Sequence, residues 1–143
     1  MNKLKILGIL SVASALTAGA HAAMAHHSAA MFDQSKTITL NGTVVEVRWT
    51  NPHVTILVDG KLEGADSTVD TAQWLVEMSS PSNLMRVSNW SRTSVKSGDK
   101  VQIKMAPLRD SDRKGGNLKT LTLIDTGQSF TPNIREREEP GLE

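Results

Sequence analysis

The chain has 143 residues, of which 16 are basic and 15 acidic, so its formal net charge is only +1. A near-neutral chain without a strong basic patch argues against a nucleic-acid partner. Cysteine is absent, which excludes disulfides and leaves packing, or packing together with a bound ligand, to stabilise the fold.

The first 25 residues follow the pattern of a secretory signal peptide. Lys3 and Lys5 supply a positive start, and residues 6–18 are apolar or small and carry no charge. This run is shorter than the roughly 20 apolar residues that span a bilayer, so an uncleaved membrane anchor is the weaker alternative. The Ala-Met-Ala sequence at 23–25 is typical of a signal-peptidase site, although two small-x-small triplets upstream compete with it. We therefore predict cleavage after Ala25, a periplasmic or secreted protein, and no stable membrane insertion after cleavage.

Residues 37–49 form the first predicted strand, because β-branched side chains dominate the segment. Asn41 and Gly42 interrupt the run, and they mark either a hairpin turn or a bulge or bend within one long strand. Beyond that pair, strand alternation predicts two faces. One face carries Thr43, Val45, Val47 and Trp49, and the other carries Val44, Glu46 and Arg48.

Two further strands are predicted over residues 53–59 and 71–78, and a polar loop over residues 60–70 separates them. Asn51 and Pro52 mark a turn or a strand entry before the first of the two. Alternation gives each strand one apolar face, formed by Val54, Ile56 and Val58 in the first strand and by Trp74, Val76 and Met78 in the second.

A short helical turn is predicted after the third strand. The Ser-Ser-Pro-Ser sequence at 79–82 ends that strand and can cap a helix. Within residues 83–87, Leu84 and Val87 are spaced to pack inward. The Ser-Gly-Asp sequence at 97–99 then predicts a tight turn.

The remaining predicted strands lie towards the end of the chain. Residues 101–105 alternate in a strand that ends at Pro107, and a charged loop follows over residues 109–117. Residues 118–125 form the final strand. Residues 131–143 contain two prolines and a mixed run of arginine and glutamate, which is typical of a frayed tail.

Five or six short strands with one helical insert predict an all-β fold. Because the insert lies between the third and fourth strands, the pattern favours a small five- to six-stranded barrel like the oligonucleotide/oligosaccharide-binding (OB) fold, with a plain β-sandwich as the alternative. We expect three regions: a signal peptide over residues 1–25, a single β-barrel domain over residues 26–130 and a flexible tail over residues 131–143. Aliphatic residues would form most of the core, with the largest fillers being Trp49, Trp74 and Trp90.

The histidines are the candidate metal ligands. Cleavage after Ala25 would make His26 the first residue, and its free α-amine and the Nδ1 atom of its imidazole can chelate one metal ion. The amine has a pKa of about 7.7, so loss of its proton costs little near neutral pH. His53, which follows Pro52 at the start of a strand, is the natural third ligand, and His27 could supply the second imidazole in its place. One amine and two imidazoles form a T-shaped set of three nitrogens that favours Cu(II) over zinc, so copper is the expected cofactor.

Other interpretations of the same residues stay open. His27 could be a surface residue beside the cleavage site, and His53 could be a buried turn histidine that bonds to backbone carbonyls. Cleavage after Met24 would make His27 the third residue, and an amine, two backbone amides and its imidazole would then bind Cu(II) without His53. Met31 could offer a soft thioether to Cu(I).

Catalytic motifs have little support in the chain. It contains no cysteine nucleophile and no serine in a nucleophile-elbow context. The Lys-Gly-Gly sequence at 114–116 predicts a turn and not a phosphate-binding loop. Glu46 and Glu77 are predicted to lie on outward, solvated strand faces.

Several motifs together resemble a family of small exported bacterial proteins that is classed as a domain of unknown function. The motifs that carry the resemblance are His26-His27-Ser28, Trp49-Thr50-Asn51-Pro52-His53, Trp74-Leu75-Val76-Glu77 and Gly98-Asp99. The resemblance covers about His26 to Phe130. It implies periplasmic export and a small β fold, and it implies no established activity.

We therefore predict a non-enzymatic periplasmic metal-binding module, for copper, that acts as a carrier or a buffer. The alternative is a module that binds a small organic or peptide ligand on a barrel face near Trp49 and Trp90, with histidines that are structural. A copper-dependent redox enzyme ranks last, because the sequence offers no supporting acid or tyrosine for it. No protein partner is predicted.

Overall fold

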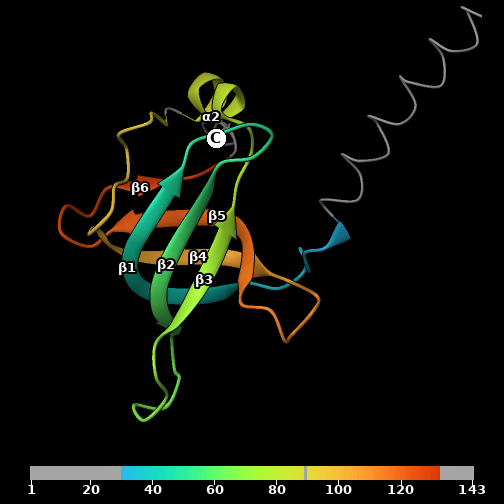
Figure 1. The fold of residues 1–143 in the computed structure, drawn as a ribbon, viewed down its shortest axis with the longest axis vertical. Coiled ribbons are helices and arrows are strands. Elements are labelled where there is room, and N and C mark those ends of the chain that lie inside the picture. The colour runs from blue at the N-terminus through green and yellow to red at the C-terminus, as the bar shows by residue number, and fades with distance from the viewer. Residues whose placement is uncertain (1–29, 89, 133–143) are drawn as a thin grey trace, which may run out of the picture. The chain divides into compact units, whose positions relative to one another are not determined.

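A computed structural model describes residues 30–88 and 90–132. The chain divides into two compact units, Met1–Phe32 and Asp33–Glu143, and all the strands described below belong to the second. The elements in chain order are β1 (Ile38–Arg48), β2 (Thr55–Leu62), β3 (Ala72–Glu77), α2 (Pro81–Val87), β4 (Lys100–Pro107), β5 (Gly115–Leu123) and β6 (Ser129–Phe130) (Figure 1). No helix in the described part of the chain is long and apolar enough to cross a membrane.

Five of the strands close into a barrel. Strand β1 pairs antiparallel with β2 and β4, β2 pairs with β3, and β4 pairs with β5. A parallel pairing of β3 with β5 closes the ring, and β6 extends the sheet beyond β5. This five-stranded barrel, with a helix between β3 and β4, has the arrangement of an OB fold. The predicted all-β, OB-like barrel is therefore confirmed.

The closing strand begins earlier than predicted. Strand β5 starts at Gly115, so the expected turn at residues 114–116 and the end of the expected loop over 109–117 are wrong. A Cβ atom added to Gly115 would lie 2.6 Å from the Leu75 carbonyl oxygen, and one added to Gly116 would lie 2.5 Å from the Ala106 carbonyl oxygen. The two glycines therefore allow the strand to approach β3 and β4 closely, whereas the sequence pattern read them as turn residues.

Strand β1 runs through Asn41 and Gly42 without a turn, and its irregularity lies further on. The register with β2 shifts between Val44 and Glu46, which identifies a bulge there. Leu40 and Val44 are buried before the bulge and Val45 is exposed, and the extra residue shifts the alternation so that Trp49 is buried after it. The predicted assignment of these residues to faces is therefore wrong.

Strand β2 also extends past the predicted end at Asp59. Residues Gly60, Lys61 and Leu62 pair with the first half of β1, in the register Gly42↔Gly60 to Leu40↔Leu62. The predicted loop over residues 60–70 is correspondingly shorter. The apolar faces predicted for the second and third strands are confirmed, because Val54, Ile56, Val58, Val76 and Met78 are all buried. Trp74, on the same face of the third strand, is partly buried and packs against this core.

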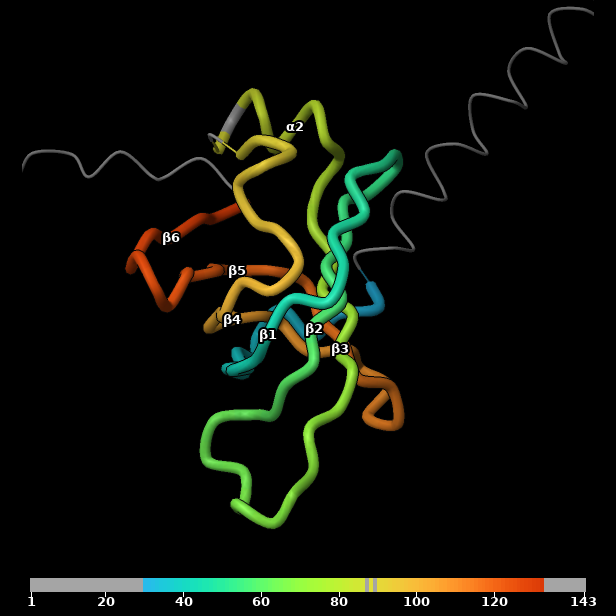
Figure 2. The backbone as a smooth tube through the Cα atoms, turned by 60° about the vertical axis from the view of Figure 1, so that its left-hand side comes forward, coloured from blue at the N-terminus to red at the C-terminus, as the bar shows by residue number. Residues whose placement is uncertain are grey.

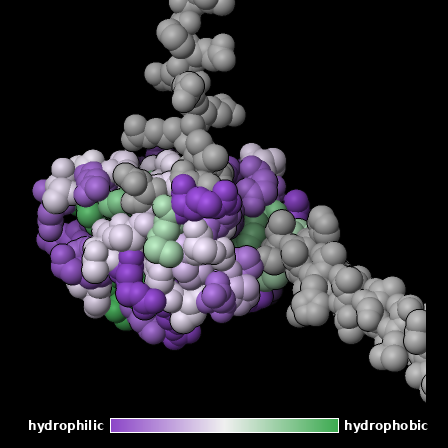
Figure 3. Space-filling model, turned by 90° about the horizontal axis from the view of Figure 1, so that it is seen from above, coloured by the Kyte–Doolittle hydropathy of each residue, from purple (hydrophilic) through white to green (hydrophobic). Residues whose placement is uncertain are grey.

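Helix α2 covers one end of the barrel. Ser80 caps it by accepting a hydrogen bond from the Asn83 backbone amide at 3.4 Å, and Pro81 follows in the first turn. Leu84 is fully buried within the core cluster of the barrel. The connection between β1 and β2 lies at the same end as α2 in both views (Figures 1 and 2). Seen from above, this end is mostly hydrophilic, with scattered apolar patches in the part that is coloured (Figure 3).

Candidate metal site around His53

His53 lies in the connection between β1 and β2, beside the end of β3. The Val54 amide donates to the Ser79 carbonyl at 3.0 Å, and the Met78 amide donates to the Val54 carbonyl at 2.9 Å. These two bonds extend the β2–β3 pairing beyond the strands themselves. They hold the backbone next to His53 against residues 78–79, and this fixes the Cα position from which the imidazole extends.

The His53 imidazole is oriented by a backbone carbonyl. Its Nδ1 atom lies 3.1 Å from the Met78 carbonyl oxygen. Because a carbonyl oxygen can only accept, Nδ1 of the neutral ring carries the proton and Nε2 keeps its lone pair. The bond to a backbone carbonyl is the contact that the structural alternative predicts, whereas the full burial of that alternative is not found, because the side chain is 38% exposed. A metal-binding histidine ordinarily donates its other ring N–H in this way.

Glu77 is the acidic neighbour of this ring. Its Oε1 atom lies 3.9 Å from Nδ1 of His53, and its side chain is 25% exposed. Glu46, for which the same solvated setting was predicted, is 47% exposed and pairs with Arg48 at 3.0 Å. Hydrogen bonding from Arg48 lowers the pKa of the Glu46 carboxyl group below its usual value. Sequence reasoning missed the difference between the two carboxylates, because it depends on the register Thr55↔Glu77 between β2 and β3.

A chain of side-chain contacts links this edge of the barrel to residue 34. The Asn117 amide donates to the Glu77 carbonyl at 3.2 Å, and the Gln34 amide donates to Asn117 Oδ1 at 3.4 Å. Since Glu77 in turn approaches His53, the segment that precedes β1 is connected to the His53 region through one residue of β5 and one of β3.

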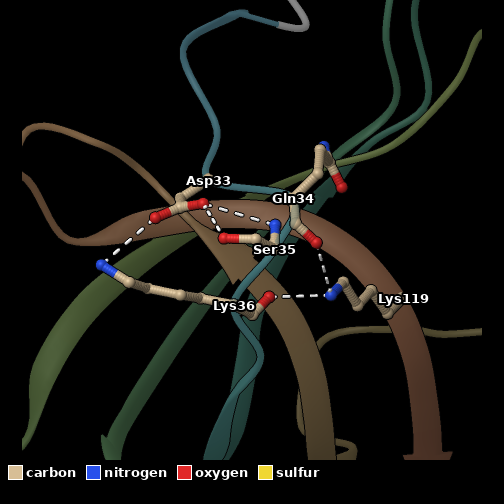
Figure 4. Close-up of polar contacts among 5 residues, drawn as sticks. All are labelled: Asp33, Gln34, Ser35, Lys36 and Lys119. Carbon is tan, nitrogen blue, oxygen red and sulfur yellow. Dashed lines mark hydrogen bonds and ion pairs between the residues drawn. The ribbon is translucent and has the colours of Figure 1, made fainter.

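The amino-terminal strap, residues 33–37, is held against the barrel by Lys119 of β5 (Figure 4). The Lys119 ammonium donates to the carbonyls of Gln34 at 3.2 Å and Lys36 at 2.7 Å, and to the Thr37 hydroxyl at 2.7 Å. Within the strap, Asp33 accepts a hydrogen bond from the Ser35 hydroxyl and pairs with Lys36. These contacts, the Ser35 bond first, lower the pKa of the Asp33 carboxyl group.

Of the three histidines predicted as metal ligands, only His53 falls within the described residues. His26 and His27 lie outside them. Among residues 30–88 and 90–132, no group of three or more histidine, cysteine or acidic side chains is arranged to hold a metal ion. The barrel by itself therefore presents one imidazole with a nearby carboxylate, and not a complete ligand set.

The tryptophans of the alternative ligand face are core residues. Trp49 and Trp90 are only 8% and 3% exposed. The Trp90 indole donates to the Thr131 carbonyl at 2.9 Å, and its ring lies 4.9 Å from that of Phe130. Their predicted role as core fillers is confirmed, and buried rings leave little surface on which a ligand could stack. A cavity of about 180 Å³ lies elsewhere, next to the turn that contains Asp99, and neither tryptophan lines it.

Comparison with known proteins adds a family match and no functional relative. Residues 13–117 match the model described as "Family of unknown function (DUF6152)". This match confirms the predicted resemblance to a domain of unknown function. No curated protein and no solved structure matches the chain.

Proposed function

This chain belongs to the DUF6152 family, which is defined without a function, and we propose from its own residues that it is an exported periplasmic protein that binds copper and catalyses no reaction. The observation that carries the proposal is the state of the His53 ring. With Nδ1–H directed to the Met78 carbonyl at 3.1 Å, the ring offers Nε2 as a neutral donor. A partly exposed imidazole fixed in one tautomer is suited to bind a metal ion without reorganisation.

The second source of ligands is the amino terminus that signal-peptide cleavage would create. An α-amine and the Nδ1 atom of His26 form a chelate that no internal histidine can form. Gln34 is linked to the His53 region through Asn117 and Glu77. Together with the His53 imidazole, this chelate would supply the three nitrogens of the proposed site.

Copper is favoured over other metals by the chemistry of these donors. One amine and two imidazoles are borderline nitrogen ligands, for which Cu(II) has the highest affinity among the divalent first-row metals. The chain has no cysteine that would favour a tetrahedral zinc site with thiolates. Three nitrogens in a T-shaped arrangement leave a fourth position for water, and we propose a carrier or a buffer as the role of such a site.

The test uses the protein as it is secreted with its own leader. Intact mass should show that the exported chain begins at His26. Cu(II) titration against a competing chelator should show one ion per chain, and the electron paramagnetic resonance spectrum should show nitrogen ligands. His53→Ala, or an extra methionine before His26, should weaken binding by more than about tenfold, because each removes one of three ligands.

His27→Ala is the matched control, since it removes the neighbouring imidazole and leaves the proposed ligands in place. Its affinity should stay within about threefold of the unmodified protein. If neither His53→Ala nor the added methionine changes the affinity, the proposed site is wrong. If His27→Ala alone abolishes binding, the ion is held by the amino-terminal segment and His53 is structural.

A further inference from the structure

We propose that Glu77 is a positioning residue for His53, one that sets the ring tautomer and tunes the site towards the doubly charged copper ion. This inference rests on the proposed copper function and specifies how the same site distinguishes oxidation states.

The geometry places two acceptors on the same side of the ring. The Met78 carbonyl oxygen lies 3.1 Å and the Glu77 Oε1 atom 3.9 Å from Nδ1. The carbonyl accepts the hydrogen bond, and the carboxylate lies too far for a second one but close enough to attract the partial positive charge of the Nδ1–H group. Both acceptors therefore favour a proton on Nδ1 and a lone pair on Nε2.

The position of Glu77 is set by the sheet. Its backbone pairs with Thr55 in β2 and with Asn117 in β5, where the barrel closes. Its carbonyl also accepts the Asn117 side-chain amide at 3.2 Å. The Glu77 side chain is 25% exposed, so water screens its charge less than that of a carboxylate on an open surface, while the His53 ring, at 38%, stays accessible to an ion.

The carboxylate has two physical consequences for a metal on Nε2. A negative charge beside Nδ1–H increases the electron density of the ring and so strengthens Nε2 as a donor. It also attracts the ion through space, and this attraction is proportional to the charge of the ion. The carboxylate therefore contributes about twice as much to the binding free energy of Cu(II) as to that of Cu(I). If Glu77 acted only as a structural support, its loss would weaken the binding of both ions equally.

Glu77→Gln is the test, because it removes the charge and keeps the shape of the side chain. Cu(II) affinity should fall about tenfold, as for other residues that support a metal-binding histidine. Cu(I) affinity should fall only about threefold, because the charge contribution is halved on a logarithmic scale. The reduction potential of the bound copper should then rise by about 30 mV, the equivalent of a threefold difference.

Glu46→Gln is the matched control. Glu46 is also a strand carboxylate, but it is paired with Arg48 and has no contact with His53 among the described residues. Its two copper affinities should equal those of the unmodified protein. Glu77→Asp keeps the charge and should retain Cu(II) binding within about threefold, and it also provides a readout if Glu77→Gln does not fold.

A measurement without copper separates this inference from the proposed function. In the metal-free protein, ¹⁵N NMR should show His53 with its proton on Nδ1, and Glu77→Gln should shift part of the population to the Nε2–H form. If His53→Ala leaves Cu(II) binding unchanged, His53 is not a copper ligand, and the tautomer shift still decides the role of Glu77. Equal losses of Cu(I) and Cu(II), loss of an oxygen ligand from the copper spectrum, or an unchanged tautomer would each overturn the inference.

Discussion

Lys119 shows how one side chain can organise a segment that has no regular structure. Its ammonium donates to two carbonyls and one hydroxyl of the amino-terminal strap. These carbonyls belong to irregular backbone and have no strand partner that the sheet pairings supply. A charged donor satisfies them, and this defines where the chain enters β1.

Lys119→Met should therefore lower the free energy of unfolding by about 1–2 kcal/mol, because three acceptors lose a charged donor and only water can replace it. Urea denaturation measures the change. Lys104→Met, at an exposed position on the neighbouring β4, should change stability by less than about 0.5 kcal/mol. Equal effects of the two substitutions would mean that the strap contacts contribute nothing to stability.

At the scale of the element, β5 is the strand on which closure of the barrel depends. It pairs with β4 along most of its length, and its first residues pair in parallel with β3. The first two of these residues are Gly115 and Gly116, because the backbones of β3 and β4 occupy the space that a Cβ atom at either position would need. Closure of the barrel thus depends on two residues without side chains, and the apolar pattern of β5 does not reveal it.

Gly116→Ala should destabilise the protein by up to about 3 kcal/mol, since the new methyl group would lie 2.5 Å from the Ala106 carbonyl oxygen and 2.8 Å from the Met105 sulfur. Gly64→Ala is the comparison. It lies in open space but has a φ of 77°, and strain there should cost only about 1 kcal/mol. Thermal and urea unfolding should rank Gly116→Ala as the more harmful substitution, and the reverse order would contradict the proposed tight closure.

At the scale of the whole barrel unit, helix α2 completes the core. The strands supply the wall, and the helix covers the end at which the β1–β2 connection with His53 also lies (Figures 1 and 2). Leu84 is the fully buried residue of the helix and belongs to the core cluster. The helix that completes the core therefore lies at the same end of the barrel as the candidate site.

Leu84→Ala should lower the free energy of unfolding by about 2–5 kcal/mol, because it removes buried methyl groups and leaves a cavity that the barrel wall cannot fill. Met85→Ala, on the neighbouring residue that is 55% exposed, should cost less than about 1 kcal/mol. Denaturant titration of both variants tests this. Similar losses of stability in the two variants would show that α2 does not contribute to the core of the barrel.

Much of the barrel follows from local sequence. The alternation of Val54, Ile56 and Val58 predicts a strand with one buried face, and the Ser-Ser-Pro-Ser sequence at 79–82 predicts a helix cap. Both are confirmed, and the helix begins at Pro81, two residues before the predicted start at residue 83. Such features depend on periodicity and on capping chemistry within a few residues, which a sequence displays directly. The family resemblance and the candidate ligand His53 were also recognisable in this way.

Pairing between distant strands decided the rest. The bulge at Val45, the early start of β5 at Gly115 and the approach of Glu77 to His53 all depend on which residues face each other across strands. A shift of one residue turns every side chain of a strand to the opposite face, and no local pattern specifies that register. The sequence by itself thus indicates the strands, the helix and the candidate histidines. Only the closed barrel determines which carboxylate lies beside the His53 ring.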